Sequence, residues 1–166
     1  ADTELKIANG MTLYGSADVA ANKTLSLNGT GTLNSALNLK GTLLAGANLE
    51  VSGTINVADN ATVSIPANTT LTYSGENLTV GAYTFSIGGS GTFGNAANSP
   101  IVLAVEESVL DLTGNGTTSG PIWLEGCTLK ASGSPTISGD IIQFDNATIE
   151  VVSGKTLYYT GTSLNI

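Results

Sequence analysis

Three observations predict an all-β fold built as a parallel β-helix, also called a β-solenoid. Apolar and polar residues alternate over short stretches, as in Leu25–Leu27 and Val63–Ile65, which is the period of a strand with one buried face. Gly or Asn stands between the stretches, and both tolerate the backbone angles of a tight corner. The pattern returns every 18 to 20 residues, so we expect eight to nine coils in one domain, residues 1–166.

A long internal repeat supports this interpretation. Residues 59–75 and 145–161 match at a constant offset of 86 residues, because Asp-Asn-Ala-Thr opens both blocks and Thr-Leu-x-Tyr lies near the end of both. Partial copies of the unit lie at residues 21–29, 48–53, 84–89, 109–114 and 128–133. Each copy reads as a corner, an alternating strand and a closing Gly. No stretch has the spacing of a stable amphipathic helix. We expect a right-handed rod of roughly 40 Å, at about 4.8 Å per coil.

Composition excludes several classes of function. The chain has five Lys, no Arg and no His against thirteen Asp and Glu, a net charge of −8. Because nucleic-acid binding needs clusters of Lys and Arg, we expect no nucleic-acid partner. The longest apolar runs, such as Ile101–Val105, are too short for a bilayer span, so we expect no membrane insertion. The single Cys127 excludes an internal disulfide and a Cys-pair zinc site, and we expect it to be buried.

Catalysis has few candidates in this chain. Without His, Ser-His-Asp and Cys-His mechanisms are excluded, which leaves pairs of carboxylates of the kind that cleave glycosidic bonds. The candidates are Glu106, Glu107, Asp111, Asp140, Asp145 and Glu150. We expect these to be solvated surface charges, and therefore no enzyme activity and no cofactor. Gly88–Phe93 lacks the Asp of a calcium-binding nonapeptide, so no metal site is expected.

Other surface functions are weaker interpretations. Thr-x-Thr pairs could bind ice if they formed rows, but this spacing does not recur on every coil. Trp123, Tyr158 and Tyr159 could stack on a sugar ring, although we expect Trp123 in the core. Seven Asn-x-Thr sequons are candidate glycosylation sites. They are Asn22, Asn28, Asn60, Asn68, Asn77, Asn115 and Asn146. An Asn corner followed by a Thr-led strand also generates such sequons by itself.

The stretch from Ile65 to Gly75 resembles the β-solenoid repeats of secreted bacterial surface proteins, namely autotransporter passengers and filamentous adhesins. The resemblance covers nearly the whole chain and lies in the style of the repeat. It implies the fold and an extracellular location, and those families also contain carbohydrate lyases and hydrolases on the same helix. The sequence opens Ala1-Asp2-Thr3, as cleavage of a signal peptide would leave it. We therefore expect a secreted protein at the cell surface.

The two ends of the sequence suggest self-association. Neither end offers a polar cap, although the end coils of a solenoid expose unpaired backbone groups. We expect the last coil of one copy to stack on the first coil of the next, and because such a contact does not close, the product is an extracellular filament. The apolar residues expected there are Leu5, Ile7, Met11 and Leu13 at one end and Leu157, Tyr159, Leu164 and Ile166 at the other.

Two alternatives to a filament of identical copies remain open. The chain could be a segment of a β-helical surface adhesin or autotransporter passenger, whose neighbouring coils would cover both ends. It could also be a carbohydrate-binding or carbohydrate-cleaving β-helix. No outward aromatic or charged cluster in the sequence marks a carbohydrate or host-surface ligand site.

Overall fold

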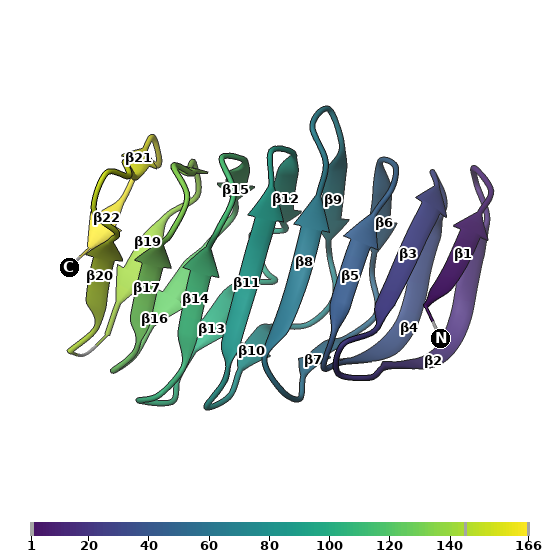
Figure 1. Ribbon diagram of the computed structural model, residues 1–166, viewed down its shortest axis with the longest axis horizontal. Helices are drawn as coiled ribbons and strands as arrows, with labels where there is room; N and C mark the ends of the chain where they lie inside the picture. The colour runs from purple at the N-terminus through teal and green to yellow at the C-terminus, as the bar shows by residue number, and fades with distance from the viewer. Residues whose placement is uncertain (1, 145, 166) are drawn as a thin grey trace.

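The computed structural model describes residues 2–144 and 146–165, and over these residues the chain is a parallel β-solenoid (Figure 1). The described elements are 22 strands and no helix, which confirms the predicted all-β fold. All described strand pairs are parallel. In Figure 1 the near strands rise and the chain returns behind them as it advances from the N-terminus to the C-terminus, so the winding is right-handed.

The first face of each coil belongs to an eight-stranded sheet, which gives the solenoid eight coils. In spatial order its strands are β1 (Thr3–Ile7), β3 (Thr24–Gly29), β5 (Thr42–Ala45), β8 (Ala61–Ile65), β11 (Thr84–Gly89), β14 (Val109–Leu112), β17 (Thr128–Ala131) and β20 (Thr148–Val151). Residues paired between neighbouring strands are 18 to 25 positions apart. Some coils are therefore longer than the 18 to 20 residues that the sequence pattern predicts.

A 14-stranded sheet forms the rest of each coil. In the first two coils one strand of eight residues spans it, β2 (Thr12–Val19) and then β4 (Thr32–Leu39). From the third coil on, two short strands replace each long one. The second face consists of β6 (Leu49–Val51), β9 (Thr70–Tyr73), β12 (Thr92–Asn95), β15 (Thr117–Ser119), β18 (Thr136–Ile137) and β21 (Tyr158–Tyr159). The third face consists of β7 (Ile55–Val57), β10 (Leu78–Val80), β13 (Ile101–Leu103), β16 (Ile122–Leu124), β19 (Ile141–Gln143) and β22 (Leu164–Asn165).

Inward side chains form rows along the rod axis, because parallel pairing keeps every second residue of each strand on the same side. One row on the first face runs through all eight coils. Its members are Thr3, Leu25, Leu43, Val63, Ile87, Leu112, Ala131 and Val151. The six interior members are at most 7% exposed, whereas Val151 is 44% exposed and Thr3 is also exposed. The core is therefore a stack of apolar layers that lies bare at both ends.

Side chains at the corners tie each coil to the next. Oδ1 of Asn48 accepts a hydrogen bond from the backbone N–H of Thr70 at 2.7 Å, one coil further along. Oδ1 of Asn60 accepts one from the N–H of Thr84 at 2.8 Å in the same way. The corner Asn residues thus satisfy the backbone N–H group of the first residue of a strand.

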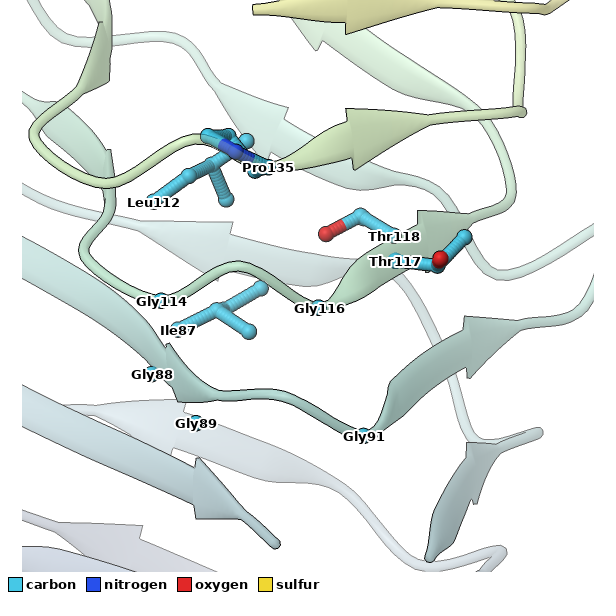
Figure 2. A pocket seen from close by; sticks show the side chains of 10 residues that line it. All are labelled: Ile87, Gly88, Gly89, Gly91, Leu112, Gly114, Gly116, Thr117, Thr118 and Pro135. Carbon is cyan, nitrogen blue, oxygen red and sulfur yellow. The ribbon is translucent and has the colours of Figure 1, made fainter. Parts of the chain in front are cut away.

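At two corners the coils approach so closely that only Gly fits. A Cβ added at Gly114 would lie 1.9 Å from the carbonyl oxygen of Gly89, and one at Gly139 would lie 1.8 Å from that of Gly120. The first of these corners holds a cavity of about 10 Å³ (Figure 2). This volume suits about one water molecule, so the cavity is a packing feature and not a ligand site.

Candidate functional site

The N-terminal edge of the solenoid consists of β1 and β2. Each of these strands pairs with one described strand only, β1 with β3 and β2 with β4. One side of each strand therefore presents backbone N–H and C=O groups that no neighbouring described strand engages. Such an edge is a template on which a further parallel strand can pair.

The residues predicted for this edge differ in how much of each side chain is exposed to solvent. Met11 is 61% exposed, and Leu13 is 39% exposed although it shares its inward row with the buried Leu33. Leu5 is partly buried and packs against the core. Ile7 is only 6% exposed, so its own molecule already covers it. The edge therefore offers Met11, Leu13 and part of Leu5 to a partner.

The C-terminal edge consists of β20, β21 and β22, which are likewise paired on one side only among the described strands. Leu164 is 45% exposed and continues the inward row of the buried Ile141. Leu157 and Tyr159 are partly buried and pack against the core. Ile166 lies outside the described residues. Both edges thus present apolar side chains in positions that are buried elsewhere in the rod.

Several exposed residues at the edges are not among those predicted for the assembly contact. Val151 ends the row of core residues on the first face, and Tyr158 on β21 is 56% exposed with its side chain outward. Tyr14 on β2 is 72% exposed and also points outward, opposite Asn34. The alternation in Thr148–Val151 could have identified Val151, because it stands two residues after the inward Ile149.

The described candidate carboxylates do not gather in one place, and Asp111 departs from the expected solvated charge, because it is partly buried and its Oδ1 has no hydrogen-bond partner among the described residues. Asp111 and Glu150 share an outward row of the first face with Lys130 between them, and Nζ of Lys130 lies 3.4 Å from Oε1 of Glu150. Glu106 and Glu107 are exposed in the turn between β13 and β14. Asp145 lies outside the described residues. Among the described residues, no group of three or more His, Cys, Asp or Glu is arranged to hold a metal ion.

Asp140 makes the most hydrogen bonds of these carboxylates. Its Oδ1 accepts a hydrogen bond from Oγ1 of Thr162 at 2.8 Å, and others from the N–H groups of Thr162 and Ser163 at 3.1 and 2.9 Å. The hydroxyl of Thr162, followed by the N–H of Ser163, lowers the pKa of Asp140 below its ordinary value of 3.8. This carboxylate therefore fastens the last coil to the coil before it.

Cys127 and Trp123 were both expected to be buried, and only Cys127 is. Cys127 is 2% exposed, as expected, and burial raises the pKa of its thiol, which disfavours the reactive thiolate. The prediction that Trp123 lies in the core is wrong. Ile122 and Leu124 occupy the inward positions of β16, so the period of the strand turns Trp123 outward, between Val102 and Ile142 of the neighbouring coils.

The Asn residues of the seven sequons lie at the surface. Six of them are exposed, and Asn28 is partly buried, with its Nδ2 donating to Oε1 of Glu4. Asn22 and Asn68 have positive φ angles of 60° and 61°, as their predicted corner positions require. A corner role accounts for Asn22 and Asn68 through these angles, and for Asn60 and Asn115 through hydrogen bonds that they accept from backbone N–H groups of the next coil. The glycosylation sites stay a prediction.

Protein-family models, curated proteins and solved structures give no match. The described residues contain no helix long and apolar enough to cross a membrane. The fold itself defines the class of the protein, a parallel β-solenoid.

Proposed function

We propose that the chain is a secreted structural subunit that stacks head to tail, coil on coil, into an extracellular filament. The observation that carries this proposal is the pair of open edges, where the strands are paired on one side only among the described residues and the apolar rows end in exposed side chains. The eight coils already stack on one another within one molecule. A second copy placed on either edge would continue that stacking with the same backbone pairing and the same kind of burial.

The rows indicate the register of the contact. If the next copy continues them, Val151 meets Thr3 of that copy on the first face. On the third face the row of Leu164 leads to Ala17 of the next copy. Both pairs bring uncharged side chains of small or medium size into contact, so no charge is buried at the junction.

The difference in strand length between the two edges does not prevent this contact. The long β2 would face the two short strands β21 and β22 of the preceding copy. The chain already contains a long strand beside two short ones, in the opposite order along the axis, because the long β4 pairs with β6 through Thr32 and Leu33 and with β7 through residues 37–39. The row of Tyr159 then arrives at Met11, the most exposed of the residues predicted for the N-terminal edge.

The outward polar residues at the junction include one pair that favours the contact and one pair that opposes it. Oδ1 of Asp18 accepts a hydrogen bond from Nδ2 of Asn38 at 2.7 Å, and Asn165 ends the same outward row, so its amide would reach Asp18 of the next copy. On the first face Glu150 arrives at Asp2, and like charges repel. With a net charge of −8 per chain, we expect added salt to promote assembly by screening.

Electron microscopy of the purified 166-residue chain at neutral pH tests the proposal. We expect uniform fibres with a subunit spacing of roughly 40 Å, from eight coils at about 4.8 Å each. Leu164→Lys places a charge on an inward row and is expected to abolish the fibres. Tyr158→Lys, on the outward side of the same edge, is the control and is expected to retain them. Circular dichroism must show the same β content in both variants.

A chain that stays monomeric at low and high salt would contradict the filament. The open edges would then be covered by further coils of a longer polypeptide, and the chain would be a segment of a β-helical surface adhesin or autotransporter passenger. The repeat style of residues 65–75 and the surface rich in Asn, Thr, Ser and Gly support an extracellular location under both proposals.

A further inference from the structure

A groove of about 560 Å³ lies at the corner between the second and third faces. Its lining comes from four consecutive coils, at the turns that follow β12, β15, β18 and β21. It therefore runs along the rod axis, and its volume lies within the range of small-molecule sites, about 300–1,000 Å³. Neither the assembly edges nor the proposed stacking contact makes use of it, except through Thr162 in the last coil.

The floor of the groove stays open because Gly forms it. A Cβ at Gly120 would lie 2.3 Å from the carbonyl oxygen of Asn95 in the coil beneath, so no side chain can stand there. Asn95 is 6% exposed, and its Nδ2 donates to the carbonyl oxygens of Ser99 and Pro121 at 3.1 and 3.0 Å. Its Oδ1 is buried without a hydrogen-bond partner. The floor thus holds an acceptor that the described residues leave unsatisfied, at a cost in free energy.

One wall of the groove is apolar and partly aromatic. Trp123 and Ile142 point outward from β16 and β19 in the same row, and Pro121 lies beside them in the lining. Phe144, which is 61% exposed, packs edge-on against Trp123 with ring centroids 5.9 Å apart and planes at 77°. This contact supports the indole on one side, and Trp123 as a whole is only partly buried.

The lining also carries hydroxyls and one carboxylate. Ser119, Ser138 and Thr162 supply the hydroxyls, and Asp140 supplies the carboxylate. The hydrogen bonds of Asp140 to Thr162 and Ser163 all use Oδ1, which leaves Oδ2 as a further acceptor of this lining residue. The lining contains no Lys. An acidic ligand would therefore meet a carboxylate with no positive charge to offset the repulsion.

We propose that this groove binds a neutral glycan chain that lies along the rod axis. A sugar ring has an apolar C–H face that suits Trp123, and hydroxyls at its rim that suit the Ser, Thr and Asp side chains. The corner repeats with every coil, at about 4.8 Å, a spacing close to the length of one sugar unit in an extended glycan. Hydrolysis would need a second carboxylate in the groove, and Asp140 is the only one in its described lining. The site binds a glycan without cleaving it.

Trp123 is the only Trp of the chain, so its fluorescence reports on this groove alone. We expect a saturable change in its emission when the chain is titrated with cellohexaose or with maltohexaose, two neutral hexasaccharides of different linkage. Hexagalacturonate, which is acidic, should bind at least tenfold more weakly. Calorimetry under the same conditions detects binding that leaves the emission unchanged.

A matched pair of variants locates the binding. Ser138→Leu fills the groove from an exposed position and is expected to weaken binding at least tenfold. Thr79→Leu adds the same side chain at an exposed position of the third face outside the groove, and binding should be unchanged. Three results would overturn the proposal: no binding of either neutral glycan by both methods, equal affinity in Ser138→Leu, or tighter binding of hexagalacturonate.

Discussion

The repeated blocks 59–75 and 145–161 have similar sequences and different surroundings. In the first block Val63 and Tyr73 are 0% exposed, because coils cover them on both sides. Their sequence counterparts Ile149 and Tyr159 remain partly exposed, since β20 and β21 are paired on one side only among the described strands. The same kind of sequence is thus fully buried when both neighbours are present. The last coil differs from an interior coil by the neighbour it lacks.

The same substitution in both regions gives the largest contrast. Val63 and Val151 lie on one inward row. Val63→Lys would bury an unpaired charge, which costs several kcal/mol out of a total stability of about 5–15 kcal/mol, so we expect unfolding. Val151→Lys leaves the charge in water and should fold normally while blocking fibres. Thermal unfolding followed by circular dichroism measures the stability of both variants, and electron microscopy shows whether Val151→Lys forms fibres. Equal loss of stability would show that Val151 is part of a closed core.

The glycines that close the two blocks give the next contrast. A Cβ at Gly75 would lie 2.3 Å from the carbonyl oxygen of Gly53, and one at Gly161 would lie 2.4 Å from that of Gly139. We expect Gly75→Ala to cost at least about 1–3 kcal/mol, because coils on both sides must move apart. Gly161→Ala should cost clearly less, since the last coil can shift outward. Urea unfolding of the two variants measures the difference, and the reverse order would contradict it.

The hydroxyls of Tyr73 and Tyr159 give a smaller effect. Burial raises the pKa of Tyr73 above its ordinary value of 10.0, and its Oη accepts a hydrogen bond from the N–H of Ile55 at 3.4 Å. Tyr73→Phe should cost about 1 kcal/mol, because it leaves that N–H unsatisfied in the core. Tyr159 donates to the carbonyl oxygen of Ser163 near the surface. Tyr159→Phe should therefore change the free energy of unfolding by only a few tenths of a kcal/mol.

The smallest effect is confined to the last coil and depends on pH. The lowered pKa of Asp140 means that the folded state favours its charged form, so this contribution to stability is complete above pH 3.8. It is lost as the pH falls through the lowered pKa, below 3.8. We expect faster hydrogen exchange at the amides of Thr162 and Ser163 in that range, before the rest of the rod opens. Asp140→Asn should remove this pH dependence; if it persists, another group causes it.

The sequence predicted the fold well because each strand carries its own signal. The alternation in Thr24–Gly29 or Thr128–Ala131 needs no information from distant residues, and inward and outward positions follow from it directly. The merging of two faces into the long strands β2 and β4 was not predictable in this way. It depends on whether the chain bends between residues 33 and 37. There the inward position is the buried Ser35 and the outward one is Ala36, so the strand continues where the apolar-polar alternation of the sequence is interrupted.

The register between the coils also could not be predicted from the sequence repeat. The sequence matches Thr62 with Thr148, whereas the rows carry Thr62 to Glu150, two residues further along the strand. A shift of two keeps inward residues inward, so the hydrophobic pattern cannot detect it. The groove could not be predicted for a similar reason. Trp123 and Asp140 lie on different coils, and only the stacking of these coils places both in the lining of one groove.

The parallel pairing of the coils also determines how the rod responds to force. The hydrogen bonds between coils run along the rod axis, so axial tension loads them in series and opens the coils one after another. The ladders between coils differ in length, because β7 and β10 share one residue pair, β21 and β22 each share two with the strand before, and β2 and β4 share eight. A stretched rod should therefore open first between coils that are joined by short ladders, while the long ladder between β2 and β4 holds to higher loads.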